Sequence, residues 1–302
     1  MEQKQKTSLL GTLLVLLAGI SWGTSGIFVR YFTAWDLSTM QQTFFKVAVA
    51  GTLMLLYCLL FDRSALKIRL KDLWVFLGAG VISLTFFTWC YFSTIQATSM
   101  STAAILLYLA PTLVMLMSSV LFKEQITKQK VVACILAFAG CVFVSGIIGN
   151  ATPLPLRALV TGLLSALGYA LYSIFGQLAL NKGYGPMTIS TYAFLFATVT
   201  ALPFLHPAQV AVTASEASPL KFFGMLALMS VTVSLAPYLL YTNGLKRTTP
   251  GNASITASIE PVTATVLGAL LFRELPDLFG YIGIALVLSA ILLLNIKKPS
   301  SK

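Results

Sequence analysis

Two stretches that are 150 residues apart decide the fold: AAILLYLAPTLVMLMSSVLFKE at residues 103–124 and ASITASIEPVTATVLGALLFRE at residues 253–274. Each apolar run contains a proline and ends with Phe, a basic residue and Glu. Residues 87–124 align with residues 237–274 without a gap. The identical pairs are Tyr91/Tyr241, Thr98/Thr248, Ala103/Ala253, Ile105/Ile255, Pro111/Pro261, Leu121/Leu271, Phe122/Phe272 and Glu124/Glu274. The chain therefore contains an internal repeat.

The composition indicates that this repeat lies in a membrane. Of the 302 residues, 57% are hydrophobic and only 10% are charged, whereas a water-soluble domain carries about 25% charged residues. A helix needs about 20 apolar residues to cross the hydrocarbon core. The sequence offers ten such runs: Leu9–Val29, Thr39–Leu60, Leu73–Phe92, Ser101–Phe122, Val131–Ile148, Leu159–Leu180, Met187–Leu205, Phe222–Thr242, Ala253–Phe272 and Leu278–Ile296. All four cysteines lie in these runs, where we expect them to act as small packing residues.

The basic residues test this count, because cytoplasmic loops of membrane proteins are enriched in Lys and Arg. With ten spans, fifteen of the twenty basic residues fall on one side, in the two termini and in the loops at 63–71, 123–130, 182 and 246–247. Four fall on the other side, and Lys46 lies inside the second span. We therefore expect an integral protein of the plasma membrane, bacterial in origin, with both termini in the cytoplasm. The formal net charge of +11 then reflects membrane orientation and predicts no nucleic-acid partner.

The two halves, residues 1–149 and 150–302, each contain five spans. Because five is an odd number, the second half must enter the membrane from the opposite side. The predicted fold is therefore an all-α bundle of ten transmembrane helices arranged as two inverted five-helix repeats. A shift of 147 residues adds a second match, since Gly19 and Gly23 align with Ala166 and Ala170. Small residues four apart allow two helix backbones to approach closely in lipid.

These motifs resemble, over nearly the whole chain, the EamA-type transporters of the drug/metabolite transporter superfamily. The resemblance rests on the Pro-centred helices that end in Glu, on Glu260-Pro261, and on the run AGISWGTS at residues 18–25. It implies an exporter or facilitator of small organic metabolites, such as amino acids or drug-like solutes, with a central cavity. Lys46 departs from this family's pattern, which often has Arg in the second span, and Lys lacks the planar fork that binds a carboxylate in two places.

Glu260 is the strongest candidate for binding a substrate or an ion. It lies near the middle of the ninth span, where an unpartnered carboxylate is costly and is functional by default. Pro261 cannot donate a hydrogen bond and tends to kink the helix, as does Pro111 at the equivalent place. A carboxylate beside freed backbone groups suits a cation, an ammonium group or a proton; otherwise Glu260 is protonated or paired and only packs helices. Lys46 either extends outward to the membrane surface, pairs with Glu260, or holds a substrate carboxylate.

Aromatic side chains are candidates for the walls of the cavity, because their faces bind cations and apolar groups. The strongest candidates are Trp22, Tyr108, Tyr169, Trp89 and Tyr238, followed by Tyr91 and Tyr241. About half of such residues are expected to face the cavity and the rest to face lipid or other helices.

Two other classes of protein remain as alternatives. Gly23-Thr24-Ser25-Gly26 has the form found around the nucleophile of intramembrane serine proteases, and His206 is the only histidine that could act as the base. A passive channel is the other alternative, although no ring of charge or filter-like repeat is present. The sequence contains no Walker A, His-Glu-x-x-His or Cys-x-x-Cys string, so it predicts no cofactor and no metal. The expected partners are the lipid bilayer, a small-molecule substrate and, as a candidate coupling ion, a proton; the oligomeric state is left open.

Overall fold

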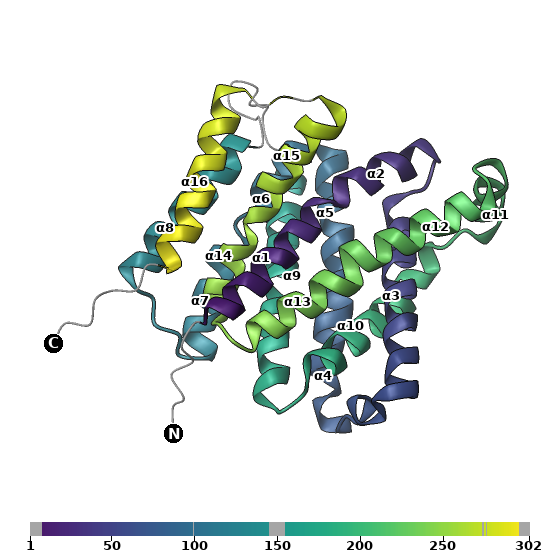
Figure 1. Ribbon diagram of the computed structural model, residues 1–302, viewed down its shortest axis with the longest axis horizontal. Coiled ribbons are helices and arrows are strands. Elements are labelled where there is room, and N and C mark those ends of the chain that lie inside the picture. The colour runs from purple at the N-terminus through teal and green to yellow at the C-terminus, as the bar shows by residue number, and fades with distance from the viewer. Residues whose placement is uncertain (1–7, 99, 145–154, 274, 276, 296–302) are drawn as a thin grey trace.

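The computed structural model describes residues 8–98, 100–144, 155–273, 275 and 277–295, and every regular element within them is helical (Figure 1). The α-helices are α1 (Leu9–Gly23), α2 (Ser25–Ala34), α3 (Thr39–Phe61), α4 (Leu73–Leu77), α5 (Phe87–Ala97), α6 (Met100–Leu107), α7 (Ala110–Leu121), α8 (Lys128–Val144), α9 (Leu156–Asn181), α10 (Pro186–Ala201), α11 (Pro207–Glu216), α12 (Pro219–Met229), α13 (Ala236–Leu245), α14 (Pro250–Ala257), α15 (Ile259–Phe272) and α16 (Leu278–Asn295). Wider π-helical turns connect α4 to α5 (η3, Gly78–Phe86) and α12 to α13 (η5, Ser230–Leu235).

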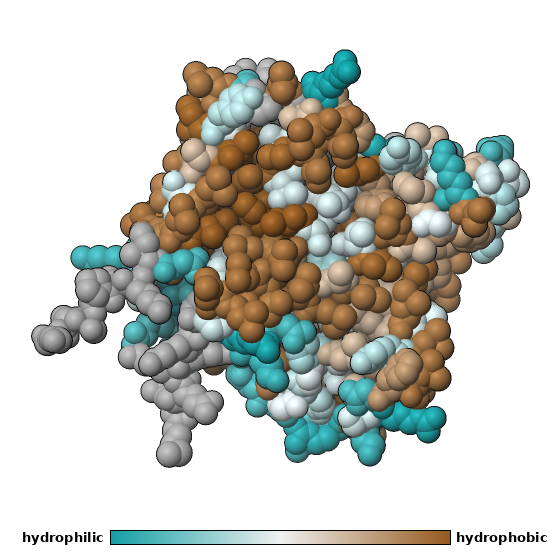
Figure 2. All heavy atoms as spheres, in the orientation of Figure 1, coloured by the Kyte–Doolittle hydropathy of each residue, from teal (hydrophilic) through white to brown (hydrophobic). Residues whose placement is uncertain are grey.

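Nine stretches of the described residues are long and apolar enough to cross a membrane. They correspond to nine of the ten predicted spans. The fifth predicted span, Val131–Ile148, coincides with α8 up to Val144, and its last four residues lie outside the described part of the chain. In Figure 2, apolar side chains cover the middle of the visible face, while hydrophilic ones gather towards its lower edge and upper right. This distribution fits a bundle whose middle faces lipid.

The fourth and ninth spans are each broken into two helices. One break is at Tyr108–Leu109, between α6 and α7, and the other is at Ser258, between α14 and α15. The two breaks are 150 residues apart and lie just upstream of Pro111 and Pro261. Proline has no N–H to offer the carbonyl four residues earlier, and its ring clashes with that carbonyl. The helix therefore ends before the proline and restarts around it.

The third and eighth spans show a second matching irregularity. Both contain π-helical turns, η3 and η5, and the repeat offset of 150 residues places η5 within the range that corresponds to η3. Ser83, within η3, donates its hydroxyl to the carbonyl of Gly78, five residues earlier. Interruptions of this kind are frequent at functional sites. The hydrophobic periodicity did not predict them.

The small residues of the first span pack directly on the broken ninth span. A Cβ on Gly19 would lie 2.5 Å from Ile259, and a Cβ on Gly23 would lie 2.8 Å from the carbonyl of Glu260. The matching Ala166 and Ala170 are fully buried in a cluster with residues of α7. In both halves, therefore, the small-residue helix lies against a helix that contains one of the breaks.

The basic connections lie at one end of the bundle. The backbone N–H of Ser8 donates to the carbonyl of Arg247 (3.1 Å), and Glu124 accepts from the N–H of Gly251 (3.2 Å). Gly176, near the end of α9, lies against Leu245 at the end of α13. Lys182, which follows α9, forms an ion pair with Asp72 (2.7 Å). These contacts place the connections around residues 69–72, 124–130, 182–184 and 246–251 at the same end, as the charge count predicted.

Candidate functional site

Glu260 lies in the first turn of α15, directly after the break at Ser258. The first N–H groups of a helix have no partner within the helix and carry a partial positive charge. The break therefore places these groups in the interior of the bundle, next to the one carboxylate of the described residues that lies within the ninth span. A carboxylate at such a helix start is favoured over one in the middle of a continuous helix.

Tyr169 connects Glu260 to the second half's first helix, α9. Its hydroxyl donates to Oε2 of Glu260 at 3.4 Å. These two side chains line a small cavity of about 10 Å³ together with Leu107, Tyr108, Ala110, Pro111, Ser254, Ala257 and Ser258. A space of this size holds about one water molecule. The cavity lies between both broken helices, so both prolines of the repeat are close to it.

Lys46 lies on α3 and does not form an ion pair with Glu260. The ion pairs between described residues within 4 Å involve Asp72 and Glu124 instead. The Lys46 and Glu260 charges are nevertheless close enough to interact electrostatically. This arrangement leaves the carboxylate oxygens of Glu260 accessible to a partner other than Lys46.

An aromatic cluster extends from Tyr169 towards α13. The ring of Trp22 lies 6.4 Å from Tyr169, 5.2 Å from Tyr238 and 5.3 Å from Tyr241. Tyr172 packs edge-on against Tyr238 at 4.9 Å. The hydroxyls of this cluster are satisfied in part by small polar neighbours, since Tyr241 bonds Ser173 at 2.7 Å. The cluster forms a largely apolar wall with hydroxyls at its edges.

The structure brings together most of the residues predicted for the site. Trp22, Tyr169 and Tyr238 are in the aromatic cluster, and Tyr108 lines the cavity beside Glu260. Trp89 lies apart from them: its side chain is 46% exposed and stacks on Phe86. Because Trp89 is on an outward face of α5, it contacts lipid in a membrane bundle.

Three residues of this region were not predicted: Tyr172, Ser254 and Ser258. Tyr172 belongs to the pattern Tyr-x-x-Tyr, which occurs at 169–172 and again at 238–241. This repeated pattern was visible in the sequence, since residues three apart share one helix face. Ser254 and Ser258 carry no such signal, because they face the cavity only as a result of the break between α14 and α15.

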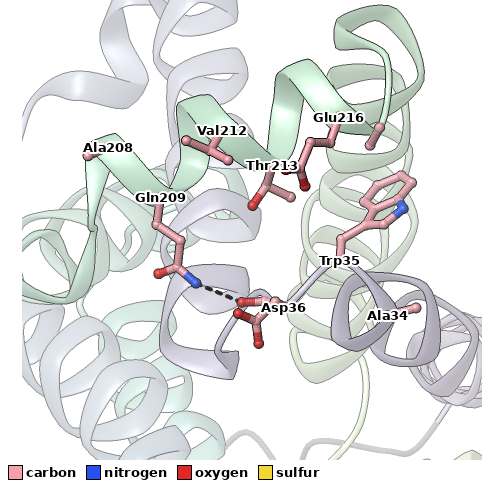
Figure 3. Close-up of a pocket in the computed structure, with 9 residues that line it drawn as sticks. Ala34, Trp35, Asp36, Ala208, Gln209, Val212, Thr213 and Glu216 are labelled. Atoms are coloured by element: carbon pink, nitrogen blue, oxygen red, sulfur yellow. Dashed lines mark hydrogen bonds between the residues drawn. The ribbon is translucent and has the colours of Figure 1, made fainter.

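A larger pocket of about 560 Å³ lies elsewhere, between α11 and the connection from α2 to α3 (Figure 3). Asp36 and Glu216 contribute exposed carboxylates, and Gln209 donates to the carbonyl of Asp36 at 2.9 Å. Carboxylates in contact with water are cheap to keep charged and mark no binding site by themselves. The Glu260 region is therefore the better candidate, although its cavity is smaller.

The arrangement needed for a serine protease is not present among the described residues. Ser25 begins α2, whereas His206 precedes α11 and is exposed. No hydrogen bond joins the two side chains. A base that activates a serine must be within hydrogen-bond reach of its hydroxyl.

Comparison with known proteins agrees with this geometry. The profile of the EamA-like transporter family matches residues 9–146 and again residues 156–296. The uncharacterized transporter YetK of Bacillus subtilis (strain 168) is 27% identical over 84% of this chain and 77% of its own length. The uncharacterized inner membrane transporter YicL of Salmonella typhimurium (strain LT2) is 27% identical over 95% of both chains. The proteins that resemble this chain are thus named as transporters.

One crystal structure shows the same fold. It superposes with a TM-score of 0.76 over 94% of this chain and 96% of its own, at 18% sequence identity. The likeness therefore extends over nearly the whole helical bundle.

Proposed function

This chain belongs to the EamA-like transporter family, and from this premise we propose that it is a secondary transporter that exports a small organic metabolite. The class of solute includes amino acids, related metabolites and drug-like molecules. The protein is an integral membrane protein, and we place the end with the basic connections, and with it both termini, in the cytoplasm. Lys and Arg are retained preferentially on that side.

The observation that carries this proposal is the position of Glu260. It lies at the start of α15, within a broken span, and accepts a hydrogen bond from Tyr169. In transporters, binding sites are typically formed near the middle of the membrane by discontinuous helices. The positive start of α15 and the wall formed by Trp22, Tyr169 and Tyr238 suit a solute that has both a charged group and an apolar part.

Transport by this site requires the bundle to open towards each side in turn. The cavity of about 10 Å³ beside Glu260 is too small for a metabolite, so the conformation described here encloses the site. The matched breaks, at Tyr108–Leu109 and Ser258, support two five-helix repeats that can exchange their conformations. In Figure 1, α6 and α7 descend while α14 and α15 ascend, as inverted repeats require. We propose that Lys46 supplies a countercharge and that a proton is the coupling ion.

The test begins with metabolite profiling of cells that lack or overproduce the protein. The solute whose level changes most is then used in proteoliposomes that contain the purified protein. Wild-type protein should show saturable counterflow of this solute, whereas Glu260→Ala should reduce it by at least tenfold, since a buried charged contact contributes about 1.5–3 kcal/mol.

Glu216→Gln serves as the matched control, because this exposed carboxylate lies outside the spans and should leave counterflow unchanged. Normal insertion of each variant is checked by its elution profile in detergent. Wild-type counterflow in both Glu260→Ala and Glu260→Gln would refute the assignment of the site. Ion conductance without counterflow would indicate a channel instead.

A further inference from the structure

A basic pocket lies at the end of the bundle that carries the basic connections, away from Glu260. It has a volume of about 530 Å³ and opens between the connection that follows α3 and the turn between α9 and α10. Lys67, Arg69 and Lys182 line it, together with one carboxylate, Asp62. That carboxylate already accepts hydrogen bonds from Ser64 and from the backbone of Ala65. The lining therefore presents three positively charged side chains, and its only acidic side chain, Asp62, already has hydrogen-bond partners.

Asp72 fixes the positions of two of these cations, Arg69 and Lys182, through ion pairs. Its side chain is only 1% exposed and accepts from Nε of Arg69 (2.7 Å), Nζ of Lys182 (2.7 Å) and the hydroxyl of Tyr184 (2.8 Å). Arg69 uses only Nε in this contact, and Lys182 uses one of its three donors. Both side chains are therefore positioned while most of their N–H groups stay available. The side chain of Lys67 forms no hydrogen bond or ion pair with any described residue.

The start of α10 adds further donors. Gly185 is the N-cap and provides no side-chain bond to the first turn. Thr188, in that turn, lines the pocket and is only 4% exposed, yet its hydroxyl bonds no described residue. This hydroxyl lines the pocket beside three cations, where it can donate a hydrogen bond to a bound anion. Helix starts of this kind bind phosphate groups.

The surroundings of the pocket are apolar and exposed. Phe61, Leu70 and Trp74 are 76%, 86% and 51% exposed, and the first two are sequence neighbours of Asp62 and Arg69 in the lining. Nζ of Lys182 lies 5.9 Å from the ring of Trp74. Trp beside Lys or Arg is typical of the level of the lipid headgroups. The pocket thus adjoins the boundary between lipid and water.

We propose that this pocket binds a phosphate group, either that of an anionic phospholipid or that of a soluble phosphate. Lys67 and the free N–H groups of Arg69 and Lys182 neutralise the charge of the phosphate. The hydroxyl of Thr188 donates to one of its oxygens. Basic pockets between transmembrane helices at the cytoplasmic side bind lipid headgroups in this way.

Native mass spectrometry of the delipidated, full-length protein tests this proposal with dioleoyl phosphatidylglycerol, and with dioleoyl phosphatidylcholine as the uncharged counterpart. Wild-type protein should retain one phosphatidylglycerol in preference to phosphatidylcholine. Lys67→Gln and Thr188→Val should each weaken this retention by about tenfold, the effect of losing one charge-assisted hydrogen bond. Lys128→Gln removes an equal charge from an exposed position outside the pocket and should behave as wild type.

A second arm separates the two sources of phosphate. Thermal melting in phosphatidylcholine nanodiscs is followed as inorganic phosphate is added. Protection by inorganic phosphate that is lost in Lys67→Gln supports the pocket with a soluble ligand, whereas retention of phosphatidylglycerol alone supports it with a lipid. Equal loss of binding in Lys128→Gln, or unchanged binding of both probes in Lys67→Gln and Thr188→Val, would overturn the proposal.

Discussion

At the scale of single residues, the proposed function depends on the environment of Glu260. The carboxylate lies at the start of α15 and accepts from Tyr169, while Lys46 is not in contact with it. Such a carboxylate can exchange its partner for a proton or for a positively charged solute without first breaking an internal ion pair. An ion pair with Lys46 would have fixed the charge of Glu260 and made proton exchange unfavourable.

If transport is coupled to protons through Glu260, Glu260→Gln should retain solute exchange but lose its response to a pH gradient. The amide of Gln keeps the shape and the hydrogen-bonding capacity of the side chain but does not titrate. Counterflow is measured in proteoliposomes with and without an imposed gradient, and Glu216→Gln is the control. The same stimulation by the gradient in wild type and in Glu260→Gln would exclude Glu260 as the proton carrier.

Gly23 makes a second prediction at this scale. A Cβ at this position would lie 2.5 Å from Thr263 and 2.8 Å from the carbonyl of Glu260, so Gly23→Ala must displace α15. We expect a loss of about 1–3 kcal/mol in stability and reduced transport. Gly26→Ala is the matched control, since nothing lies within 4 Å of its Cβ position. The melting midpoints of Gly23→Ala and Gly26→Ala are compared to test this prediction. Equal midpoints would contradict the close packing of α1 on α15.

The sequence predicted much of this site, because charge and proline are rare inside apolar spans and therefore conspicuous. Glu260, Pro111 and Pro261 were identified in this way. The aromatic residues were harder, since Trp and Tyr are equally suited to a cavity wall and to a lipid-facing surface. Trp22 and Trp89 look alike in the sequence, yet one packs among tyrosines and the other is 46% exposed. Only the rotation of each helix distinguishes them.

At the scale of helices and turns, interruptions matter more than the regular helices. The prolines predicted kinks in the fourth and ninth spans, but the helices end four residues before each proline, at Leu107 and Ala257. These are the residues whose carbonyls lack the N–H that the proline cannot supply. The first span was predicted as continuous, whereas α1 and α2 meet at Thr24. The π-helical turns η3 and η5 also left no trace in the hydrophobic pattern. Such features depend on packing between helices, which composition does not record.

The turn between α7 and α8 provides a prediction at this scale. Glu124 has a side chain that is only 5% exposed; it accepts from Nζ of Lys130 (2.7 Å) and from the N–H of Gly251 (3.2 Å). It thereby ties the first half of the chain to the start of α14. Burial alone would raise the pKa of Glu124, but hydrogen bonds from Lys130, Ser118 and Thr249 hold this pKa below its ordinary value.

Because the pKa of Glu124 is lower in the folded protein, its ionised form stabilises the fold above the ordinary pKa of Glu, near 4.3. This stabilisation is lost as the pH falls through the lower, folded value. Glu124→Gln should therefore cost about 1–2 kcal/mol at pH 7 and flatten the decline of the melting midpoint between about pH 5 and pH 3. Asp36→Asn, an exposed acid at the other end, is the control. Parallel pH profiles for wild type and Glu124→Gln would contradict this role.

At the scale of the whole molecule, the order of the helices through the membrane decides whether two halves can enclose one site. The contacts of Ser8 with Arg247 and of Asp72 with Lys182 bring basic connections from both halves to one end of the bundle. Helix α10 starts beside the basic connections and leads away from them. Glu216, at the end of the following helix α11, therefore lies away from this end of the bundle. An odd number of spans per half would turn the internal repeat into a pair of opposed units, and the proposed mechanism depends on this topology.

Thiol labelling in intact cells tests this threading. Lys71→Cys and Lys246→Cys should react with a membrane-impermeant maleimide only after the cells are permeabilised, whereas Glu216→Cys should react at once. All three positions are exposed, and the four native cysteines are buried and free, so the background should be low. If positions 71 and 246 were labelled from opposite sides, one half would contain an even number of spans. The halves would then run in the same direction, and a site that opens alternately to both sides could not be built from their exchange.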